Sequence, residues 1–208
     1  WKKQEIGENW YLGETLITGI GQGYIQTTPL QLTLMTAQLA NGGNKIYPTL
    51  IPNKKKIDQI KKQMEGGEDY DLPSNYPPLV RNKENVKFVL DAMFKSTNEV
   101  YGTSYSSRIE DPKYQFAGKT GTAQVKRITE AERELDRKLE QIPYKERDHA
   151  WYIAFGPYKN PRYALTVLVE HGGSGSSAAA PIAKKLFKKI IDRHEEREKI
   201  RNKKIIIS

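Results

Sequence analysis

Residues 115–125, QFAGKTGTAQV, place a lysine and two threonines around small residues in one short segment. Lys119 and Thr120 present an ammonium group and a hydroxyl side by side, a pair suited to binding a carboxylate. Gly121 has no side chain, so the backbone of a ligand can approach closely there. If the segment is a strand at a sheet edge, a peptide can bind along it as an added strand. We interpret it as a candidate peptide site, with a plain turn as the alternative.

Two glycine patterns that could bind nucleotide phosphates are incomplete. A phosphate loop requires G-x-x-x-x-G-K-[ST], and Lys113 stands where the first glycine should be. GIGQGY at 19–24 begins like a dinucleotide-binding fingerprint, but Tyr24 replaces the third glycine and no strong strand precedes it. We interpret these glycines as a tight turn, and the sequence predicts no nucleotide site at either position.

The residue types that usually build metal, thiol or hydrolase sites show no matching pattern. The chain has no cysteine, and its histidines, His149, His171 and His194, lack metal-ligand spacing. No G-x-S-x-G elbow occurs, although a Ser-His-Asp triad assembled from distant parts of the chain stays open. The sequence therefore predicts neither a metal nor a cofactor.

Composition predicts a globular chain with a basic surface. The 208 residues are 37% hydrophobic and carry a net charge of +9, concentrated in residues 54–62 and 184–204. Acidic residues are interleaved and aromatics are few in these runs, so we predict solvated helix faces and no nucleic-acid partner. A basic surface-binding protein remains a weaker alternative. The longest apolar run, 163–169, is far shorter than the roughly 20 residues that span a membrane.

Two helices are predicted before the K-T-G segment. Residues 28–41 begin with a threonine N-cap, a proline and a capping-box glutamine, which predicts a buried helix. Residues 86–97 carry apolar side chains at helical spacing and predict a second helix. Between them, residues 52–78 are rich in Lys, Gly, Asp and Pro and indicate a long exposed connection.

A helix, a hairpin and a final helix are predicted after the K-T-G segment. Residues 129–141 begin with a capping box and predict a mostly exposed helix. The β-rich runs 149–157 and 162–172 flank the turn signal YKNP and predict an antiparallel hairpin. A flexible glycine-rich link at 172–175 then leads to an amphipathic helix at 178–194, which should lie on the sheet. Its expected apolar face carries Ile182, Leu186 and Ile190, with Phe187 alongside.

Three stretches and their order resemble the C-terminal half of the transpeptidase domain of class B penicillin-binding proteins, most specifically the penicillin-binding protein 2 group. The stretches are AGKTGTAQV, GIGQGYIQTTPLQLTLMTAQLANGG and DHAWYIAFGPYKNPRYALTVLVEHGGSGSSAAAPI. The resemblance covers most of the chain apart from the linker and the last few residues. It implies an α/β fold of the α+β type, the penicilloyl-serine transferase or β-lactamase-like fold, in which helices flank an antiparallel sheet.

The resemblance also implies a division of residues 1–208. Residues 1–52 would be part of an all-helical subdomain, and 53–80 a linker or insertion. Residues 81–208 would be the strand, helix, hairpin and helix that carry K-T-G. Because the first residue is not methionine, we expect an incomplete domain that belongs to a longer protein.

Members of this family use three active-site motifs, S-x-x-K, S-x-N and K-[ST]-G. Only the third is visible, at residues 119–121, because no serine has a lysine three positions later. We therefore expect the nucleophilic serine and its lysine upstream of Trp1, and an inactive chain when it is alone. Residues 96–98 spell S-T-N, but they follow GIGQG where the family's motif precedes it, so we interpret them as a coincidence.

The resemblance implies a peptidoglycan D,D-transpeptidase that cross-links stem peptides through a serine acyl-enzyme. Lys119 and Thr120 would recognise the carboxylate of the terminal D-Ala, with Gly121 beside them. The Thr122 hydroxyl would contact the same carboxylate, and the Thr122 amide would form half of the oxyanion hole. β-Lactams, which mimic the D-Ala-D-Ala end, would acylate the same serine.

The same resemblance implies a setting in the cell. The protein would act at the periplasmic face of a bacterial inner membrane, anchored by an upstream segment, during cell-wall elongation. Its partners would be membrane proteins of the elongation complex, including a glycosyltransferase. A β-lactam sensor is the alternative, because such sensors share the K-T-G strand. The GIGQG, TPLQL and HAWYIAFGP segments favour the biosynthetic enzyme.

Overall fold

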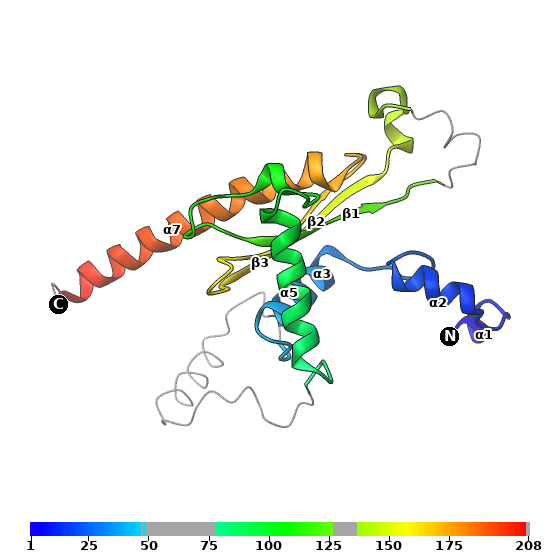
Figure 1. The fold of residues 1–208 in the computed structure, drawn as a ribbon, viewed down its shortest axis with the longest axis horizontal. Coiled ribbons are helices and arrows are strands. Elements are labelled where there is room, and N and C mark those ends of the chain that lie inside the picture. The colour runs from blue at the N-terminus through cyan, green and yellow to red at the C-terminus, as the bar shows by residue number, and fades with distance from the viewer. Residues whose placement is uncertain (47, 49–77, 127–136, 207–208) are drawn as a thin grey trace.

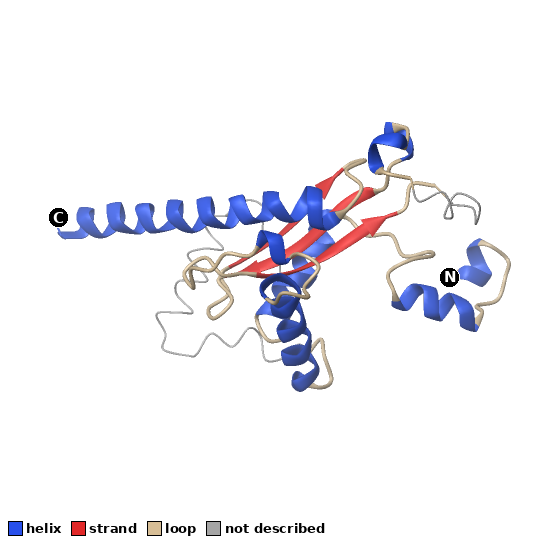
Figure 2. Ribbon diagram, turned by 45° about the horizontal axis from the view of Figure 1, so that its top comes forward, coloured by secondary structure: helices blue, strands red, loops and turns tan. Residues whose placement is uncertain are grey.

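A three-stranded antiparallel sheet lies between helices on both faces (Figures 1 and 2). This is a computed structural model, in which residues 1–46, 48, 78–126 and 137–206 are described. Helix α7 covers one face of the sheet, and helices α3 and α5 cover the other. Most of the predicted linker at 53–80 lies outside the described residues. No helix in the described part of the chain is long and apolar enough to cross a membrane.

The K-T-G segment forms an edge strand, as predicted. Strand β1 (Ala117–Ala123) pairs antiparallel with β2 (His149–Gly156), which pairs with β3 (Tyr163–Val169) to give the order β1-β2-β3. The predicted hairpin is therefore confirmed. In this register Lys119 lies opposite Ile153. Among the described residues, no strand pairs with the outer edge of β1.

The predicted amphipathic helix forms as α7 (Ala180–Ile206), but its expected apolar face was wrong, because Ile182 and Leu186 are 41% and 38% exposed. The neighbouring face, one position further along the chain, packs on the sheet instead. Ala183, Phe187 and Ile191 follow one another every four residues and are fully buried. The ring of Phe187 stacks on that of Phe116, just before β1, with centroids 4.9 Å apart. A single π-helical turn, η4 (Gly175–Ala179), joins the helix to the glycine-rich link.

Helices α3 (Pro29–Ala40) and α5 (Lys83–Asn98) cover the opposite face of the sheet, and both helices were predicted. The capping box of α3 forms as expected, since the backbone amide of Gln31 donates to the Thr28 hydroxyl at 3.2 Å. The prediction that this helix is buried was wrong. Only Thr36 is buried, and Met35 is 40% exposed. Helix α3 packs on β2 and β3 with one side, and its other side borders an open groove.

The predicted helix at 129–141 lies mostly outside the described residues. Its last part is a short 3-10 helix, η2 (Leu139–Gln141), and a second one, η3 (Tyr144–Glu146), follows before β2. Residues 137 and 138 are not helical. The prediction of a continuous helix up to residue 141 was therefore wrong at its C-terminal end.

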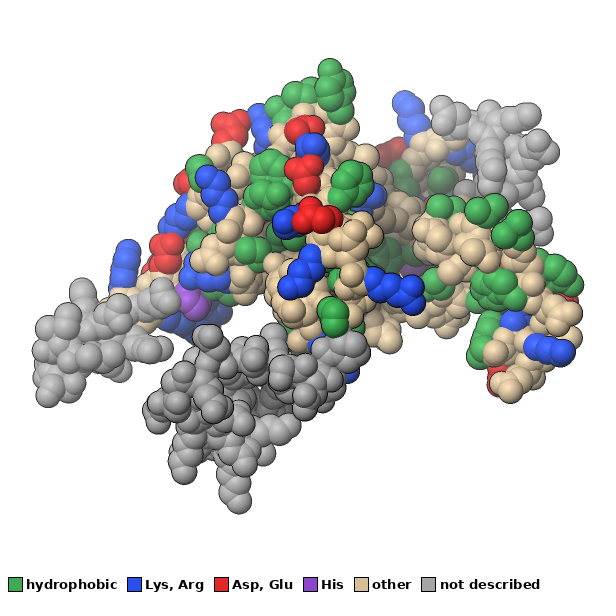
Figure 3. Space-filling model, turned by 60° about the horizontal axis from the view of Figure 1, so that its bottom comes forward, with side chains coloured by type: hydrophobic (Ala, Val, Ile, Leu, Met, Phe, Trp, Pro, Cys, Tyr) green, Lys and Arg blue, Asp and Glu red, His purple; other side chains and the backbone are tan. Residues whose placement is uncertain are grey.

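The first 25 residues form an arm that extends away from the sheet (Figure 1). The arm contains α1 (Lys2–Glu5) and α2 (Leu12–Gly19) and exposes many hydrophobic side chains, which Figure 3 shows at its right. The large exposed ones are Trp1, Ile6, Trp10, Tyr11, Leu12, Leu16, Ile17, Ile20, Tyr24 and Ile25.

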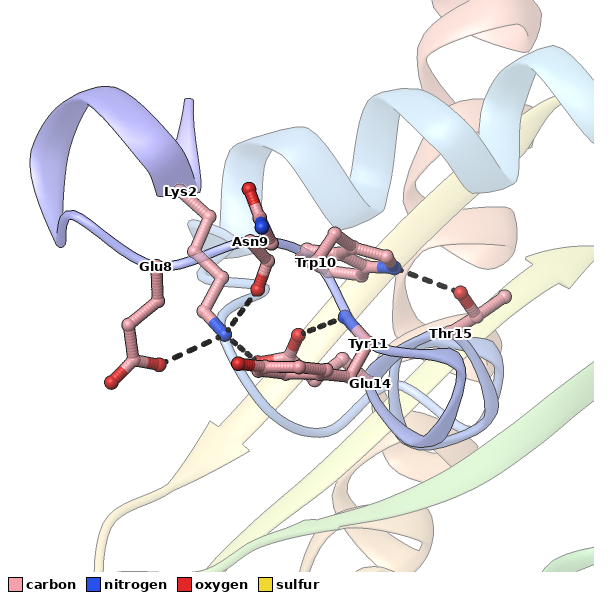
Figure 4. A network of polar contacts seen from close by, with 7 residues as sticks. All are labelled: Lys2, Glu8, Asn9, Trp10, Tyr11, Glu14 and Thr15. Carbon is pink, nitrogen blue, oxygen red and sulfur yellow. Dashed lines mark hydrogen bonds and ion pairs between the residues drawn. The ribbon is translucent and has the colours of Figure 1, made fainter.

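A buried lysine joins the two helices of the arm (Figure 4). The Lys2 Nζ atom lies 2.6 Å from a carboxylate oxygen of Glu14 and 3.2 Å from one of Glu8, and it donates to the Asn9 carbonyl at 3.0 Å. The hydrogen bond from Lys2 lowers the pKa of the Glu14 carboxyl below its usual value. Glu14 also accepts from the Tyr11 amide at 2.7 Å, so Lys2 supports the first turn of α2.

We expect Lys2→Met to loosen this arm while leaving the sheet intact. The substitution leaves the carboxylates of Glu8 and Glu14 without their shared cation, so the amides of residues 11–14 should exchange hydrogen faster. Hydrogen exchange followed by mass spectrometry measures this effect. Lys3→Met is the matched control, because Lys3 is exposed and no ion pair is found for it among the described residues. Equal exchange in the two variants would show that the Lys2 ion pairs do not hold the arm.

Candidate functional site

The predicted site residues lie on the exposed part of β1. Lys119 and Thr122 are exposed, while Thr120 and Gly121 are half-buried. The Lys119 ammonium donates to the Thr120 carbonyl at 2.8 Å and lies 3.4 Å from the Thr120 hydroxyl. Within the described part of the chain no carboxylate pairs with Lys119. Its charge is therefore available to an anionic ligand at the open edge of the sheet.

Lys119 borders a groove of about 560 Å³ between the sheet and helices α3 and α5. Apolar side chains dominate the groove, and its polar groups other than Lys119 lie at the end of α5 and in the loop that follows. The lining residues are Met35, Leu39, Phe88, Val89, Ala92, Met93, Lys95, Ser96, Glu99, Tyr101, Gly102, Thr103, Lys119 and Ile153. An ammonium group beside an apolar groove is suited to a ligand or segment that has a carboxylate next to apolar surface.

A buried group of hydroxyls packs against β1 at the end of α5. The Tyr152 hydroxyl lies 2.9 Å from that of Thr97 and 3.0 Å from that of Ser104. Burial raises the pKa of the Tyr152 phenol, so it stays neutral and can share hydrogen bonds with both. A side chain at Gly118 would lie 2.4 Å from this hydroxyl, so the strand requires glycine there.

The S-T-N triplet at 96–98 contacts the K-T-G strand, although it lies at the end of α5. The side-chain amide of Asn98 donates to the Phe116 carbonyl at 2.9 Å, and the Thr97 hydroxyl lies 3.5 Å from the Gly118 carbonyl. The triplet therefore fixes the position of β1 relative to α5. Its interpretation as a chance S-x-N match stays a prediction.

The glycine-rich link ends in close contact with the K-T-G strand. A Cβ atom at Gly175 would lie 2.3 Å from the Trp151 carbonyl oxygen and 2.7 Å from that of Gly121. Gly175 is itself buried. We predicted a flexible link here, and the structure shows instead that its last residue is tightly packed, because two strands and η4 meet at this point.

Three side chains of β2 near the site have structural contacts. Phe155 is fully buried under α5, while His149 and Trp151 are half-buried. The His149 Nδ1 atom accepts from the His171 amide at 2.9 Å, so it links β2 to the residues that follow β3. Gly21 and Gly23 both have positive φ, 79° and 78°, which confirms a tight turn between α2 and α3.

Comparison with known proteins decides the family. The sequence model of one protein family, the penicillin binding protein transpeptidase domain, matches residues 2–188 of this chain. The chain belongs to this family. The prediction from the sequence is confirmed, and so is the mixed α/β fold with an antiparallel sheet.

Relatives within the penicillin-binding protein family are similar over most of this chain. Peptidoglycan D,D-transpeptidase MrdA of Haemophilus influenzae is 37% identical over 193 residues, which make up 90% of this chain. The structure of Pseudomonas aeruginosa PBP2 in complex with WCK 5153 shares 37% identity over 88% of this chain, with a TM-score of 0.64. The complex between PBP2 and MreC from Helicobacter pylori gives 32% identity, 92% coverage and a TM-score of 0.67.

This penicillin-binding protein chain spans only part of each relative. It covers 27% of the Haemophilus influenzae protein, 34% of the Pseudomonas aeruginosa chain and 30% of the Helicobacter pylori chain.

Sequence reasoning missed the residues that support K-T-G from other elements. Thr103 and Ser104 lie in a short loop without periodicity, and Gly175 was attributed to flexibility. Two modest signals could have found them: the Gly-Thr-Ser run at 102–104, shortly after the end of α5, and the Gly-Ser-Gly run at 173–175, which leads into η4. Both patterns are typical of positions where backbone segments approach closely.

Proposed function

We propose that this chain forms the K-T-G side of the active site of a peptidoglycan D,D-transpeptidase, in a longer protein that supplies the nucleophilic serine upstream. The observation that supports it best is the exposed Lys119 ammonium beside a mostly apolar groove, on a sheet edge where no other strand of the described residues pairs. A stem peptide ending in D-Ala-D-Ala has both features required by this site, an extended backbone and a terminal carboxylate.

In the proposed reaction the serine hydroxyl attacks the carbonyl carbon of the penultimate D-Ala. The C–N bond to the terminal D-Ala breaks, a proton passes to the leaving amine, and an acyl-enzyme remains. An amine of a neighbouring stem peptide then attacks the ester and restores the serine. Lys119 and the hydroxyls of Thr120 and Thr122 hold the terminal carboxylate, and the Thr122 amide stabilises the oxyanion. Gly121 lets the peptide approach β1 closely.

The groove beside Lys119 is the place where we expect the upstream S-x-x-K segment to pack. Its walls are mostly apolar, and Met35 and Phe88 are 40% and 75% exposed in this chain. Apolar surface of this kind favours burial under another element. A helix in the groove would bring its serine close to Lys119, which the proposed reaction requires.

We place the longer protein at the periplasmic face of the bacterial inner membrane, anchored by an upstream segment. Its partners there would be the stem peptide, β-lactams and membrane proteins of the elongation complex, including a glycosyltransferase. The structure of the Helicobacter pylori relative is a complex with MreC, which supports a protein partner for the longer protein.

Covalent labelling by a fluorescent penicillin tests the proposed function. The chain joined to the polypeptide encoded before Trp1 should take the label at one serine and should release D-Ala from a pentapeptide. The 208-residue chain alone should take no label. An unlabelled long protein that contains S-x-x-K would refute the enzyme, and labelling without D-Ala release would favour a β-lactam sensor.

A further inference from the structure

Three hydroxyl groups from three elements form a row that ends at Lys119. The Ser96 hydroxyl in α5 lies 3.2 Å from that of Thr103 in the following loop. The Thr103 hydroxyl lies 3.2 Å from that of Thr120 in β1, which lies 3.4 Å from the Lys119 ammonium. Ser96, Thr103 and Lys119 all line the groove.

The protons in this row decide what Thr120 can offer to a ligand. An ammonium group only donates, so Thr120 accepts from Lys119. A hydroxyl has a single proton, and that of Thr120 points either toward Thr103 or toward a ligand beside Lys119. If it points toward Thr103, a carboxylate in the site meets the oxygen lone pairs of Thr120 and is repelled. If Thr103 donates instead, the Thr120 proton remains available to the carboxylate.

The loop around Thr103 is held firmly enough to fix this geometry. The Ser104 amide and the Ser104 hydroxyl both donate to the Ser96 carbonyl at 3.0 Å. A Cβ atom at Gly102 would lie 2.3 Å from the same carbonyl oxygen, so the loop lies directly against the end of α5. Thr103 is therefore fixed on both sides, and its hydroxyl stays within reach of Thr120.

We propose that Thr103 is a positioning residue, whose hydroxyl donates to Thr120 and thereby turns the Thr120 proton toward the carboxylate of the bound ligand. Ser96 donates to Thr103 in turn, and a row of hydroxyls that all donate in one direction strengthens each bond along it. This inference rests on the proposed function, because it assigns the ligand's carboxylate to this site.

Three substitutions in the long protein test this role. Thr103→Val removes the hydroxyl at nearly constant shape, and the second-order rate of penicillin acylation should fall about tenfold, the effect of one hydrogen bond to a charged group. Thr103→Ser keeps the hydroxyl and should stay within about threefold of wild type, the scatter expected for a small change in packing. Ser96→Ala removes only the distal donor and should cost about threefold.

Thr33→Val is the matched control. Thr33 makes the same kind of bond, 2.9 Å from the Thr166 hydroxyl, but between α3 and β3 and away from Lys119. This variant should lose a similar amount of thermal stability and keep the wild-type acylation rate. The methyl ester of the same penicillin tests whether the effect depends on the carboxylate. The ester should acylate the wild-type protein more slowly than the free acid, and its rate should change little in Thr103→Val.

The possible outcomes separate this inference from the proposed function. Wild-type acylation rates in both Thr103→Val and Ser96→Ala would overturn the role of Thr103 and leave the proposed function standing. An equal loss of rate with the free acid and with the ester would do the same. If the wild-type protein takes no label, both proposals fail. If Thr103→Val does not fold, Ser96→Ala and Thr103→Ser still test the role of Thr103. If these hydroxyls served stability alone, each folded variant would acylate at the wild-type rate.

Discussion

Lys119→Ala should reduce penicillin acylation of the long protein by about a hundredfold to a thousandfold, the loss that follows removal of one key donor from an acyl-transfer site. The Lys119 ammonium is exposed and forms its described hydrogen bonds only with Thr120, so its charge is available to the ligand's carboxylate. The fold should be unaffected, because alanine at this exposed position leaves no cavity in the core. Stopped-flow labelling with a fluorescent penicillin, together with a thermal melt, measures both quantities.

Lys95→Ala is the control for this prediction. Lys95 lines the same groove, but its ammonium is paired with the Asp91 carboxylate at 2.8 Å, which raises the pKa of the lysine. Its removal changes the net charge of the groove by the same amount as Lys119→Ala and should leave acylation within about twofold of wild type. A similar loss in both variants would mean that Lys119 acts only through the general field of the groove, and wild-type rates in Lys119→Ala would remove it from the site.

Local patterns in the sequence predicted the elements that position the site. The final helix, the capping box of α3 and the turn signal between β2 and β3 all formed as expected, although α7 buries the face next to the predicted one. Each of these signals depends on residues close together in the chain, so a single sequence contains all the information.

The burial of α3 and the packing of Gly175 could not be predicted in the same way. Both depend on which distant segment lies against the residue in question. Met35 has the same periodicity as a core residue, yet it faces the groove. Gly175 stands in a run that is typical of a flexible loop, and only the approach of β1 and β2 shows why a side chain does not fit there.

The hydroxyl contacts beside K-T-G could not be predicted from the sequence for a related reason. Ser96, Thr103 and Thr120 are separated in the chain and belong to three different elements. Their hydroxyls meet only because the Ser104 amide holds the loop against the end of α5. No sequence spacing describes such a contact, whereas the adjacent residues of K-T-G could be recognised directly.

Gly175→Ala should displace the K-T-G strand without touching any ligand. The new methyl group would lie 2.3 Å from the Trp151 carbonyl oxygen and 2.7 Å from that of Gly121, and both are backbone atoms that cannot rotate away. Either β1 or η4 must shift, so we expect a loss of about 1–3 kcal/mol in the free energy of unfolding, the usual cost of overpacking. Because the Thr122 amide follows Gly121 directly, acylation should fall at least about tenfold, as small displacements of a catalytic group cost this much or more.

Gly156→Ala separates displacement of the site from general loss of stability. A Cβ atom at Gly156 would lie 3.1 Å from side-chain atoms of Phe116 and Phe187, at the end of β2 that is remote from Thr122. These contacts are longer than the backbone contacts at Gly175, the Phe187 ring can adjust, and the contact with Phe116 lies at the end of β1 opposite to Thr122. Gly156→Ala should therefore melt at a lower temperature than wild type but acylate at the wild-type rate when folded. If Gly175→Ala also acylates normally, the contact between η4 and Gly121 serves stability alone, and the position of the Thr122 amide must be set by its pairing with β2.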